Sequence, residues 1–347
     1  MLNLEFFNRP TSISAKVIAD SISEAGVRIT TFEIEYPRIV MSEFNTMRAI
    51  SKNSSSSRAI PVSKMLEHTV KTNLKPIYFG AKQSGMQAGD ELVGEDLQYA
   101  QDVWESALTR AVGQAELLDE CGVAKEVTNR LVEPFQLVKV VCTATDWDNF
   151  FNLRLHPDSD PNICMLAYKM YKAMQQSSPN TLREGEWHLP YVETSRGISG
   201  EENEPCILYW HTNKMEFLTL EQAQRISAAS CASVSYRTEG MTLEKADKIF
   251  DMLINAEVVH SSPFEHLATP IVEYWSKQGD TFDVFINKEL SRNVPRFQKT
   301  WQEGITHSRK DGKLCSGNLT GWVQYRHLLP NNTAWKFDFD KRMELFN

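Results

Sequence analysis

The amino-acid sequence predicts an α+β protein, because strand-like and helix-like apolar patterns both occur along the chain. Residues 27–36 alternate apolar and polar side chains, as a half-buried strand does, and residues 137–143 form a short apolar run rich in β-branched side chains. Residues 96–120 instead repeat apolar side chains at helical spacing and are followed by Gly122. We therefore expect two strands and one long helix at these positions.

Weaker patterns and helix-ending residues predict the other elements. Gly26 and Pro157 are expected to end two helices, while Asp146 and Thr242 are expected to cap the start of two others. The expected elements are helices at residues 15–26, 38–50, 124–132, 146–154, 162–175, 220–234, 242–257 and 321–329, and a strand at residues 267–274. Residues 75–95 are expected to form a loop, and residues 276–318 show no clear pattern.

Three consecutive segments, residues 1–176, 177–224 and 225–347, are expected to form one intertwined catalytic domain. The middle segment begins with residues 177–204, which contain serines, glycines and two prolines and are typical of a linker. Because this stretch also contains Trp187 and His188, we expect it to be ordered in part.

Composition limits the classes of function. The net charge of −8 disfavours binding along a nucleic-acid backbone, but it allows a local basic pocket for one small anion. The six cysteines form no C-x-x-C pair, and no His/Cys cluster has metal-ligand spacing, so we expect reduced thiols and no metal site. No apolar stretch has the length of a membrane span, no secretory leader is evident, and neither G-x-G-x-x-G nor a P-loop occurs. We expect a cytoplasmic protein without a Rossmann or Walker nucleotide site.

A serine-rich stretch at residues 48–58 carries groups that suit a phosphate. Four successive serines stand between an apolar helix and the segment AIPVSKM, with an arginine at each edge. Hydroxyls and backbone N–H groups beside guanidiniums form strong, charge-assisted hydrogen bonds to anions. The alternative is a solvated linker, which serine runs commonly are. The candidate residues are Arg48, Ser51, Asn53, Ser54, Ser56 and Arg58.

A second stretch, HSSPFEH at residues 260–266, has a capping interpretation and a functional one. Ser262 as N-cap, Pro263 at the first helical position and Glu265 as the capping-box partner explain the residue types by helix capping alone. His260 and His266 are then polar groups satisfied near the turn. A cofactor contact is the other interpretation.

A third stretch, DWDNFFNLR, is mostly core-forming. Trp147, Phe150 and Phe151 are expected in the core, which leaves Asn149 and Arg154 as the polar candidates. A lone helical arginine is usually a surface residue, and this applies equally to Arg130 in VTNRLVEP.

Together these stretches resemble the flavin-dependent thymidylate synthases, whose signature has the form R-H-R-x-x-S-x-N-E-x-S-x-R-Y. The corresponding stretch here is residues 46–59. It departs from the signature at four positions, which hold Thr46, Met47, Ser54 and Ala59. The signature residues that match are Arg48, Ser51, Asn53, Ser56 and Arg58.

Further blocks of that family also have counterparts here, but in a different order. Residues 122–134 and 143–154 resemble the family's helix and its N-F-L-N-L-R segment, and residues 232–236 and 260–266 resemble the blocks A-R-V-S-[FY] and H-x-[ST]-P-F-E-H. In the family the last two blocks precede the signature, so the chain resembles a circularly permuted or rearranged relative, which is tolerable when termini are close. Residues 321–332 resemble the Arg-His part of the signature weakly, which makes Arg326 and His327 candidates for the missing pair.

The resemblance implies a fold, a reaction and roles. It implies a central, mostly antiparallel sheet flanked by long helices, with sites formed between subunits of a homotetramer. It implies reductive methylation of dUMP to dTMP with FAD as cofactor and NADPH and methylenetetrahydrofolate as co-substrates, without a cysteine nucleophile. Arg154 would polarise the pyrimidine ring. Substrate contacts would be Glu43, Ser54, Ser56, Arg58, Arg130 and Arg154, and flavin contacts Arg48, Asn53, Asn149, Ser235, His260, Ser262 and Glu265.

Two alternatives stay open because four signature positions differ. One is a related enzyme that adds another one-carbon group, such as hydroxymethyl, to a deoxyuridine nucleotide. The other is a homologue that binds a nucleotide without catalysis. Binding of single-stranded nucleic acid is disfavoured by the charge of −8 and the absence of a basic stripe.

Overall fold

A five-stranded sheet forms the centre of the molecule. The computed structural model describes residues 2–85, 87–198, 205–212, 216–235, 240–256, 259–272, 301–333 and 339–344. The strand order is β3-β4-β2-β1-β5, and neighbours are antiparallel except for β1 and β5. The strands are β1 (Ser14–Ser23), β2 (Arg28–Pro37), β3 (Ser51–Ser54), β4 (Leu137–Ala144) and β5 (Asn180–Leu182). The predicted α+β class with a mostly antiparallel central sheet is confirmed.

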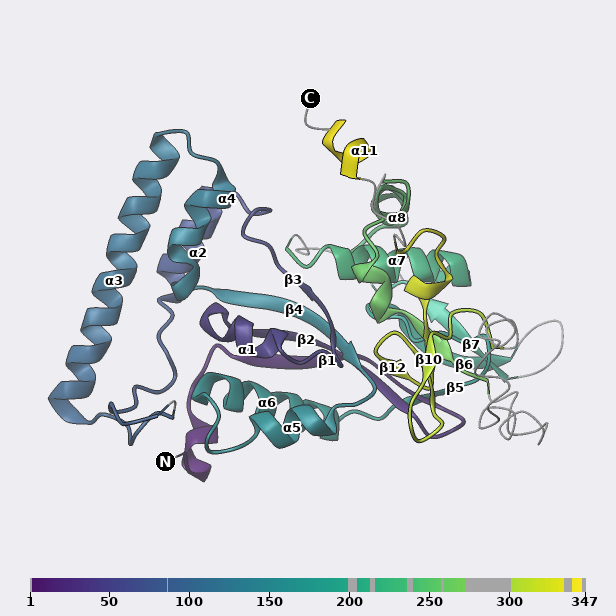
Figure 1. Cartoon of the computed structure of the whole chain (residues 1–347), viewed down its shortest axis with the longest axis horizontal. Coiled ribbons are helices and arrows are strands. Elements are labelled where there is room, and N and C mark those ends of the chain that lie inside the picture. Colours follow the sequence, from purple (N-terminus) through teal and green to yellow (C-terminus); the bar gives the residue numbers. More distant parts are fainter. Residues whose placement is uncertain are drawn as a thin grey trace.

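One face of the sheet is covered by helices from the first half of the chain (Figure 1). Because side chains alternate between the two faces of a strand, Phe32, Cys142 and Lys52, which are in register, all lie on this face. The buried aromatic rings of Phe44 and Phe150 belong to the same core, as expected for the third stretch. The covering helices are α1 (Met41–Asn45), α5 (Asp148–Arg154) and α6 (Pro161–Gln175), preceded in the chain by η1 (Leu4–Asn8) and η2 (Arg38–Val40).

A helical layer beside the sheet has its own small core. The long helix α3 (Gly94–Glu120) packs through Leu108, Val112 and Ala115, its buried residues. Its partners are α2 (Val62–Thr72), α4 (Lys125–Thr128) and η3 (Asn129–Phe135). The predicted long helix is confirmed, while the helix predicted at residues 124–132 is split into α4 and η3 because Pro134 has no N–H for α-helical bonding.

The second half of the chain covers the opposite face of the sheet and contributes a further core around Phe264 and Trp322. Its helices are α7 (Leu220–Ala232), α8 (Leu243–Ile254), η4 (Ser262–His266), η6 (Tyr325–Leu328) and α11 (Phe339–Met343). Its strands are β6 (Glu193–Ile198), β7 (Pro205–Trp210) and β8 (Phe217–Leu218) in one sheet, β9 (Ala268–Pro270) with β13 (Trp322–Gln324), and β10 (His307–Ser308), β11 (Leu314–Ser316) and β12 (Leu319–Thr320) in a third.

The helix predicted at residues 15–26 is wrong, since this stretch is β1. It pairs antiparallel with β2, and the β-branched residues Val17, Ile18 and Ile22 suit the pleated surface. Gly26 does not end a helix but supplies the positive φ (+79°) of the hairpin turn. Apolar residues at positions 15, 17, 18, 19 and 22 fit a helix as well as a strand, and pairing with β2 decides between them.

Three other predicted helices are shorter or differently built. The helix predicted at 38–50 ends by Asn45, and residues 321–329 form β13 and η6 rather than one helix, because β13 pairs with β9. Asp146 is not an N-cap: α5 starts at Asp148 after Trp147, and the Asp146 carboxylate instead accepts from the Thr320 hydroxyl (2.8 Å).

Several predictions from the second half are confirmed. Thr242 caps α8 by accepting from the Lys245 backbone N–H (3.3 Å), and α7 covers most of residues 220–234. The strand predicted at residues 267–274 is β9, with residues 273–274 outside the described range. Of the unassigned residues 276–318, those from 301 onward form β10 and β11.

The middle segment, residues 177–224, contributes directly to the fold. It supplies β5 to the central sheet and β6, β7 and β8 to a second one, with residues 199–204 and 213–215 outside the description. Trp187 and His188 are buried. The division of the chain into three segments remains a prediction. Within the described ranges, every helix is too short or too polar to cross a membrane.

Candidate functional site

The serine-rich stretch begins on β3, the edge strand of the central sheet, and is ordered beyond it. Ser55 and Ser57 are buried, and Ser55 exchanges hydrogen bonds with the backbone of Lys139 on β4 (2.8 and 3.2 Å). The Ser57 hydroxyl donates to Glu133 (3.0 Å), and the Asn129 amide donates to the Ser57 carbonyl (2.8 Å). The solvated-linker interpretation is therefore wrong, because β4 and η3 hold this loop in place.

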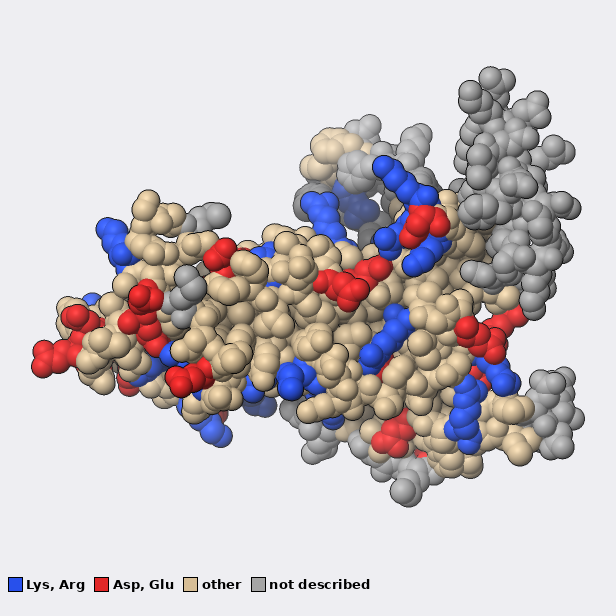
Figure 2. Space-filling model, turned by 90° about the horizontal axis from the view of Figure 1, so that it is seen from below, with Lys and Arg blue, Asp and Glu red and all other residues tan. Residues whose placement is uncertain are grey.

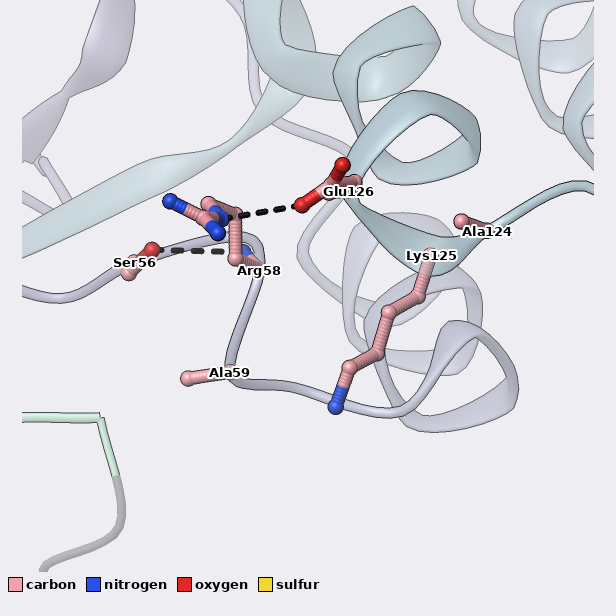
Figure 3. Close-up of a pocket in the computed structure, with 6 residues that line it drawn as sticks. All are labelled: Ser56, Arg58, Ala59, Ala124, Lys125 and Glu126. Atoms are coloured by element: carbon pink, nitrogen blue, oxygen red, sulfur yellow. Dashed lines mark hydrogen bonds and ion pairs between the residues drawn. The ribbon is translucent and has the colours of Figure 1, made fainter. Parts of the chain in front are cut away.

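Beside this loop lies a cavity of about 480 Å³, lined by Ser56, Arg58, Ala59, Ala124, Lys125 and Glu126 (Figure 3). The Ser56 hydroxyl accepts from the Arg58 backbone N–H (3.3 Å), and the Arg58 guanidinium donates to Glu126 (3.0 Å). In Figure 3 the Lys125 ammonium points away from Glu126 along the same opening. Both cations are solvent-exposed, so their charges are available to an anionic group.

A second candidate cluster joins α1 and α5. The Arg154 guanidinium donates to the Thr46 hydroxyl (3.2 Å) and to the Glu43 carbonyl (3.5 Å), while its Nε is buried without a partner. Thr46 occupies the first arginine position of the signature. The structure thus brings Glu43 and Arg154 together, but neither lines the cavity beside Arg58.

The second half of the chain contacts the signature stretch through α7 and the residues that directly follow it. The Asn53 amide donates to the Cys231 carbonyl at the end of α7 (3.2 Å), and the Ser56 backbone N–H donates to the Ser235 hydroxyl (2.9 Å). Ser235 is therefore near the cavity that contains Arg58. Two blocks separated by about 180 residues in sequence meet here, as the resemblance implies.

The capping box predicted in HSSPFEH is wrong. The residues form the short 3₁₀ helix η4, which has no side-chain cap, and Ser262 is its exposed first residue. The Glu265 carboxylate instead forms an ion pair with Arg326. The Lys52 ammonium, which donates to the Met47 carbonyl (2.5 Å) and lies over the Phe44 ring, is also attracted by Glu265. Burial nevertheless lowers the pKa of Lys52.

A buried chain of hydrogen bonds links the two halves under this site. His188 contacts the Ser21 hydroxyl through Nδ1 (2.9 Å) and the Thr31 hydroxyl through Nε2 (2.8 Å). Thr31 contacts Thr143 (2.6 Å), and Thr143 contacts Nδ1 of His266 (2.8 Å), whose Nε2 is buried without a partner. Complete burial lowers the pKa of both imidazoles to about 3, so both are neutral at pH 7.

The remaining candidate residues lie at the surface around these clusters. Arg48, Asn149 and Arg130 are exposed, on the stretch before β3, on α5 and on η3 respectively. His260 is exposed and is held through its backbone N–H, which donates to the Leu253 carbonyl (3.1 Å). Ser54 is on β3, in register with Val140. None of these residues lines the cavity beside Arg58.

Sequence patterns missed His188, Gln324 and Asn318. His188 is marked only as part of an ordered linker, Asn318 lies in a stretch without a clear pattern, and Gln324 precedes the weak Arg-His resemblance without matching any signature position. The Gln324 amide donates to Asn318 (2.7 Å) and to the Ser51 hydroxyl (3.3 Å), which brings residues 318–324 against β3. No local signal marks such a contact, because the partners are over 260 residues apart in sequence.

Charges of both signs are interspersed on the face shown in Figure 2. Among the residues the structure describes, no group of three His, Cys, Asp or Glu side chains is placed to hold a metal ion.

The geometry defines an α+β protein in which the serine-rich edge strand β3, flanked in sequence by Arg48 and Arg58, meets the second half of the chain. The family model described as thymidylate synthase complementing protein matches residues 26–180. This confirms the resemblance to the flavin-dependent thymidylate synthases for that range, which is less than half of the chain and contains the signature stretch and Arg154.

Two solved structures are similar to parts of the chain. Both are of a UMP/dUMP methylase, PolB, from Streptomyces cacaoi. The complex with 5-Br UMP has 15% identity and a TM-score of 0.40, over 48% of this chain and 90% of that one. The complex with 5-Br dUMP has 15% identity and a TM-score of 0.38, over 48% and 91%. No curated protein gives a match.

The residues present fit a flavin nucleotide. Among the described residues, the buried side-chain atoms without a hydrogen-bond partner include Arg38 Nε and Asn129 Oδ1 beside the serine loop, and also Asn53 Oδ1, Arg154 Nε, His266 Nε2 and Arg326 Nε. Buried polar atoms without partners are costly, so a ligand that carries both donors and acceptors suits them. An isoalloxazine ring and a diphosphate together provide both kinds of group.

Proposed function

We propose that this protein catalyses the reductive methylation of dUMP to dTMP, with FAD as cofactor and methylenetetrahydrofolate and NADPH as co-substrates. The observation that carries the proposal is the contact of Ser56 with Ser235, which joins the signature stretch to a second block of the same family. Residues 26–180 also match that family's model.

The cavity beside Arg58 is the proposed place for the nucleotide phosphate. Arg58 and Lys125 supply positive charge at its opening, and Ser56 supplies a hydroxyl. Glu126 partly neutralises the charge of Arg58. Because both side chains of this ion pair are exposed to solvent, the pair contributes little stability, and a phosphate can replace Glu126 as the partner of Arg58. Arg130 and Ser54 are proposed as further contacts to the nucleotide.

Arg154 is the proposed electrophilic residue. Its guanidinium is held by Thr46 and the Glu43 carbonyl, so it is oriented before a ligand binds. A fixed cation beside a pyrimidine carbonyl stabilises the negative charge that develops on the ring. Bound flavin supplies the redox chemistry of the transfer, and the protein supplies binding and orientation.

Flavin contacts are proposed at Arg48, Asn53, Asn149, Ser235, His260, Ser262 and Glu265. Since Arg154 and Arg58 belong to different clusters in one chain, we propose that copies of the chain associate, as a homotetramer, to complete each site. Light scattering of the purified protein measures its assembly.

An absorption spectrum of the purified protein tests the cofactor. We expect a flavin band at about 450 nm, or its appearance after soaking with FAD. Incubation with dUMP, methylenetetrahydrofolate and NADPH is then expected to give dTMP by mass. A hydroxymethylated product would identify the related one-carbon transferase, and binding of dUMP by a protein that takes up no FAD would indicate a nucleotide-binding homologue.

Arg154→Ala tests the electrophilic role. Loss of an oriented cation from the reacting ring is expected to lower kcat by about a hundredfold. Arg110→Ala is the matched control, because Arg110 is an exposed helical arginine on α3. Equal turnover in the two variants, or an Arg154→Ala melting temperature that falls with no specific loss of turnover, would contradict the assignment.

A further inference from the structure

Arg326 comes from the far C-terminal part of the chain, outside the range that matches the family model. It is the second residue of η6, which directly follows β13, and β13 pairs with β9 immediately after η4. This pairing places the Arg326 guanidinium against the Glu265 carboxylate. The side chain of Arg326 stays 30% exposed, so a ligand can still reach it.

Amide bridges tie this segment to the signature stretch. The Gln324 side chain donates to Asn318 (2.7 Å), the Ser51 hydroxyl (3.3 Å) and the Glu265 carbonyl (3.4 Å). The Asn318 side chain in turn donates to the Ala49 carbonyl (3.0 Å) and accepts from Ser51 (3.1 Å). These bonds hold η6 beside the start of β3.

Gly317 allows the close approach of the turn before β12. It has a φ of +57°, and a Cβ atom there would lie 2.6 Å from Gln324 Oε1 and 2.8 Å from His327 Nε2. A larger residue would therefore displace both side chains. Gln324 and His327 therefore both lie close to Gly317, and Arg326 lies between them in sequence.

The charge balance around Glu265 is positive. Its one carboxylate faces the guanidinium of Arg326 and is also within electrostatic reach of the Lys52 ammonium. The Arg326 Nε is buried and has no partner. A positively charged cluster with an unused donor favours an anionic ligand such as a phosphate group.

We propose that Arg326 is a cofactor-binding residue that contacts a phosphate-bearing flavin nucleotide beside β3. The proposal rests on the proposed function for the identity of the ligand. It assigns residues 314–328 to one wall of the site. Arg326 would supply a cation from the C-terminal part of a chain whose signature stretch has Thr46 and Met47 in place of arginine and histidine.

Titration of FAD against flavin-free protein, followed by flavin fluorescence, tests this assignment. We expect Arg326→Gln to bind FAD about tenfold more weakly than wild type, with an intermediate loss in Arg326→Lys, which keeps the charge opposite Glu265. Arg309→Gln is the matched control, since it breaks an ion pair with Asp146 in the same C-terminal segment and is expected to bind FAD within about twofold of wild type.

The outcomes separate this inference from the proposed function. If wild type takes up no FAD, the proposed function fails. If wild type takes up FAD but Arg326→Gln and Arg326→Lys bind it as wild type does, only the role of Arg326 is overturned. Weaker binding of dUMP with unchanged binding of FAD would also overturn it, because the phosphate would then be that of the substrate. If Arg326→Gln does not fold, the FAD affinity of Arg326→Lys tests the role of Arg326, provided that this variant melts at the wild-type temperature.

Discussion

His188 is a buried imidazole that no sequence motif marked, and it joins the middle of the chain to the central sheet. Both ring nitrogens contact hydroxyls, Ser21 on β1 and Thr31 on β2. Complete burial lowers the pKa of His188 and of His266 to about 3, because a charged ring would lose its hydration. In the unfolded chain both imidazoles return to an ordinary pKa.

This difference predicts acid sensitivity. Between about pH 6.5 and 3 the unfolded chain binds protons that the folded chain does not, so the contribution of both imidazoles is complete above that window and is lost as the pH falls through it. At about pH 5 the expected loss is about 2 kcal/mol for each imidazole. Chemical unfolding at several pH values measures it.

The His188→Asn variant tests whether His188 is a source of this acid sensitivity. We expect it to be less stable than wild type at neutral pH but to lose less stability on acidification. His156→Asn, a change at an exposed histidine, is expected to leave the pH dependence unchanged. A wild-type free energy of unfolding that is the same at both ends of the window would refute the account.

At the scale of elements, the turn between β12 and β13 depends on Gly321. Its backbone N–H donates to the Leu314 carbonyl (2.8 Å), and its carbonyl accepts from Ile271 (3.0 Å). Its φ is +72°, and a Cβ atom there would lie 3.0–3.3 Å from the Val27 side chain. The turn therefore needs glycine for two reasons, conformation and space.

Gly321→Ala is expected to be destabilising by about 2 kcal/mol or more, as seen in thermal unfolding. Gly122→Ala is the matched control, because Gly122 has a φ of +75° but no atom near its Cβ position. The control carries only the conformational cost, about 1 kcal/mol. Equal losses in the two variants would show that Val27 does not restrict the turn.

Elements whose sequence shows one clear periodicity can be predicted. Elements whose conformation depends on pairing with a distant segment cannot. The alternation in residues 27–36 and the repeat in residues 96–120 indicate β2 and α3 directly. β1 was mistaken for a helix because its pattern fits both periods, and only pairing with β2 resolves it. HSSPFEH has the residues of a capping box, but Arg326 engages Glu265 instead.

For the candidate site, residue types were predictable and their grouping was not. The signature stretch and the block with Ser235 were both indicated, and the contact between Ser56 and Ser235 brings them together. Arg154 lies apart from the cavity beside Arg58, a separation that depends on tertiary packing and leaves no trace in sequence.

At the scale of the molecule, the family match ends at residue 180, inside the structure of the central sheet. β5 (Asn180–Leu182) begins at that residue and pairs with β1. The second half of the chain covers the sheet face opposite the helices of the first half, and there Val141 packs with Cys231 and Val234. The matched range therefore holds three strands of the central sheet and the α-helices of the first half, but neither β1 nor the elements that cover the opposite face.

A fragment of residues 1–180 is accordingly expected not to fold stably, because it would expose Val141 and leave Thr31 and Thr143 without His188 and His266. Far-UV circular dichroism and limited proteolysis measure this. Co-expression with residues 181–347 is expected to restore protection against the protease. Cooperative melting of the fragment alone, at the temperature of the full chain, would contradict the prediction.

The buried chain from Ser21 to His266 has one further consequence. Each neutral imidazole and each hydroxyl has a single hydrogen to donate, so every hydrogen bond in the chain must run from donor to acceptor in the same direction. Only two orientations exist, and they leave His266 Nε2 either as a donor or as an acceptor. Whatever engages that atom also sets the tautomer of His188 and the direction of the Ser21 hydroxyl, with no change in net charge.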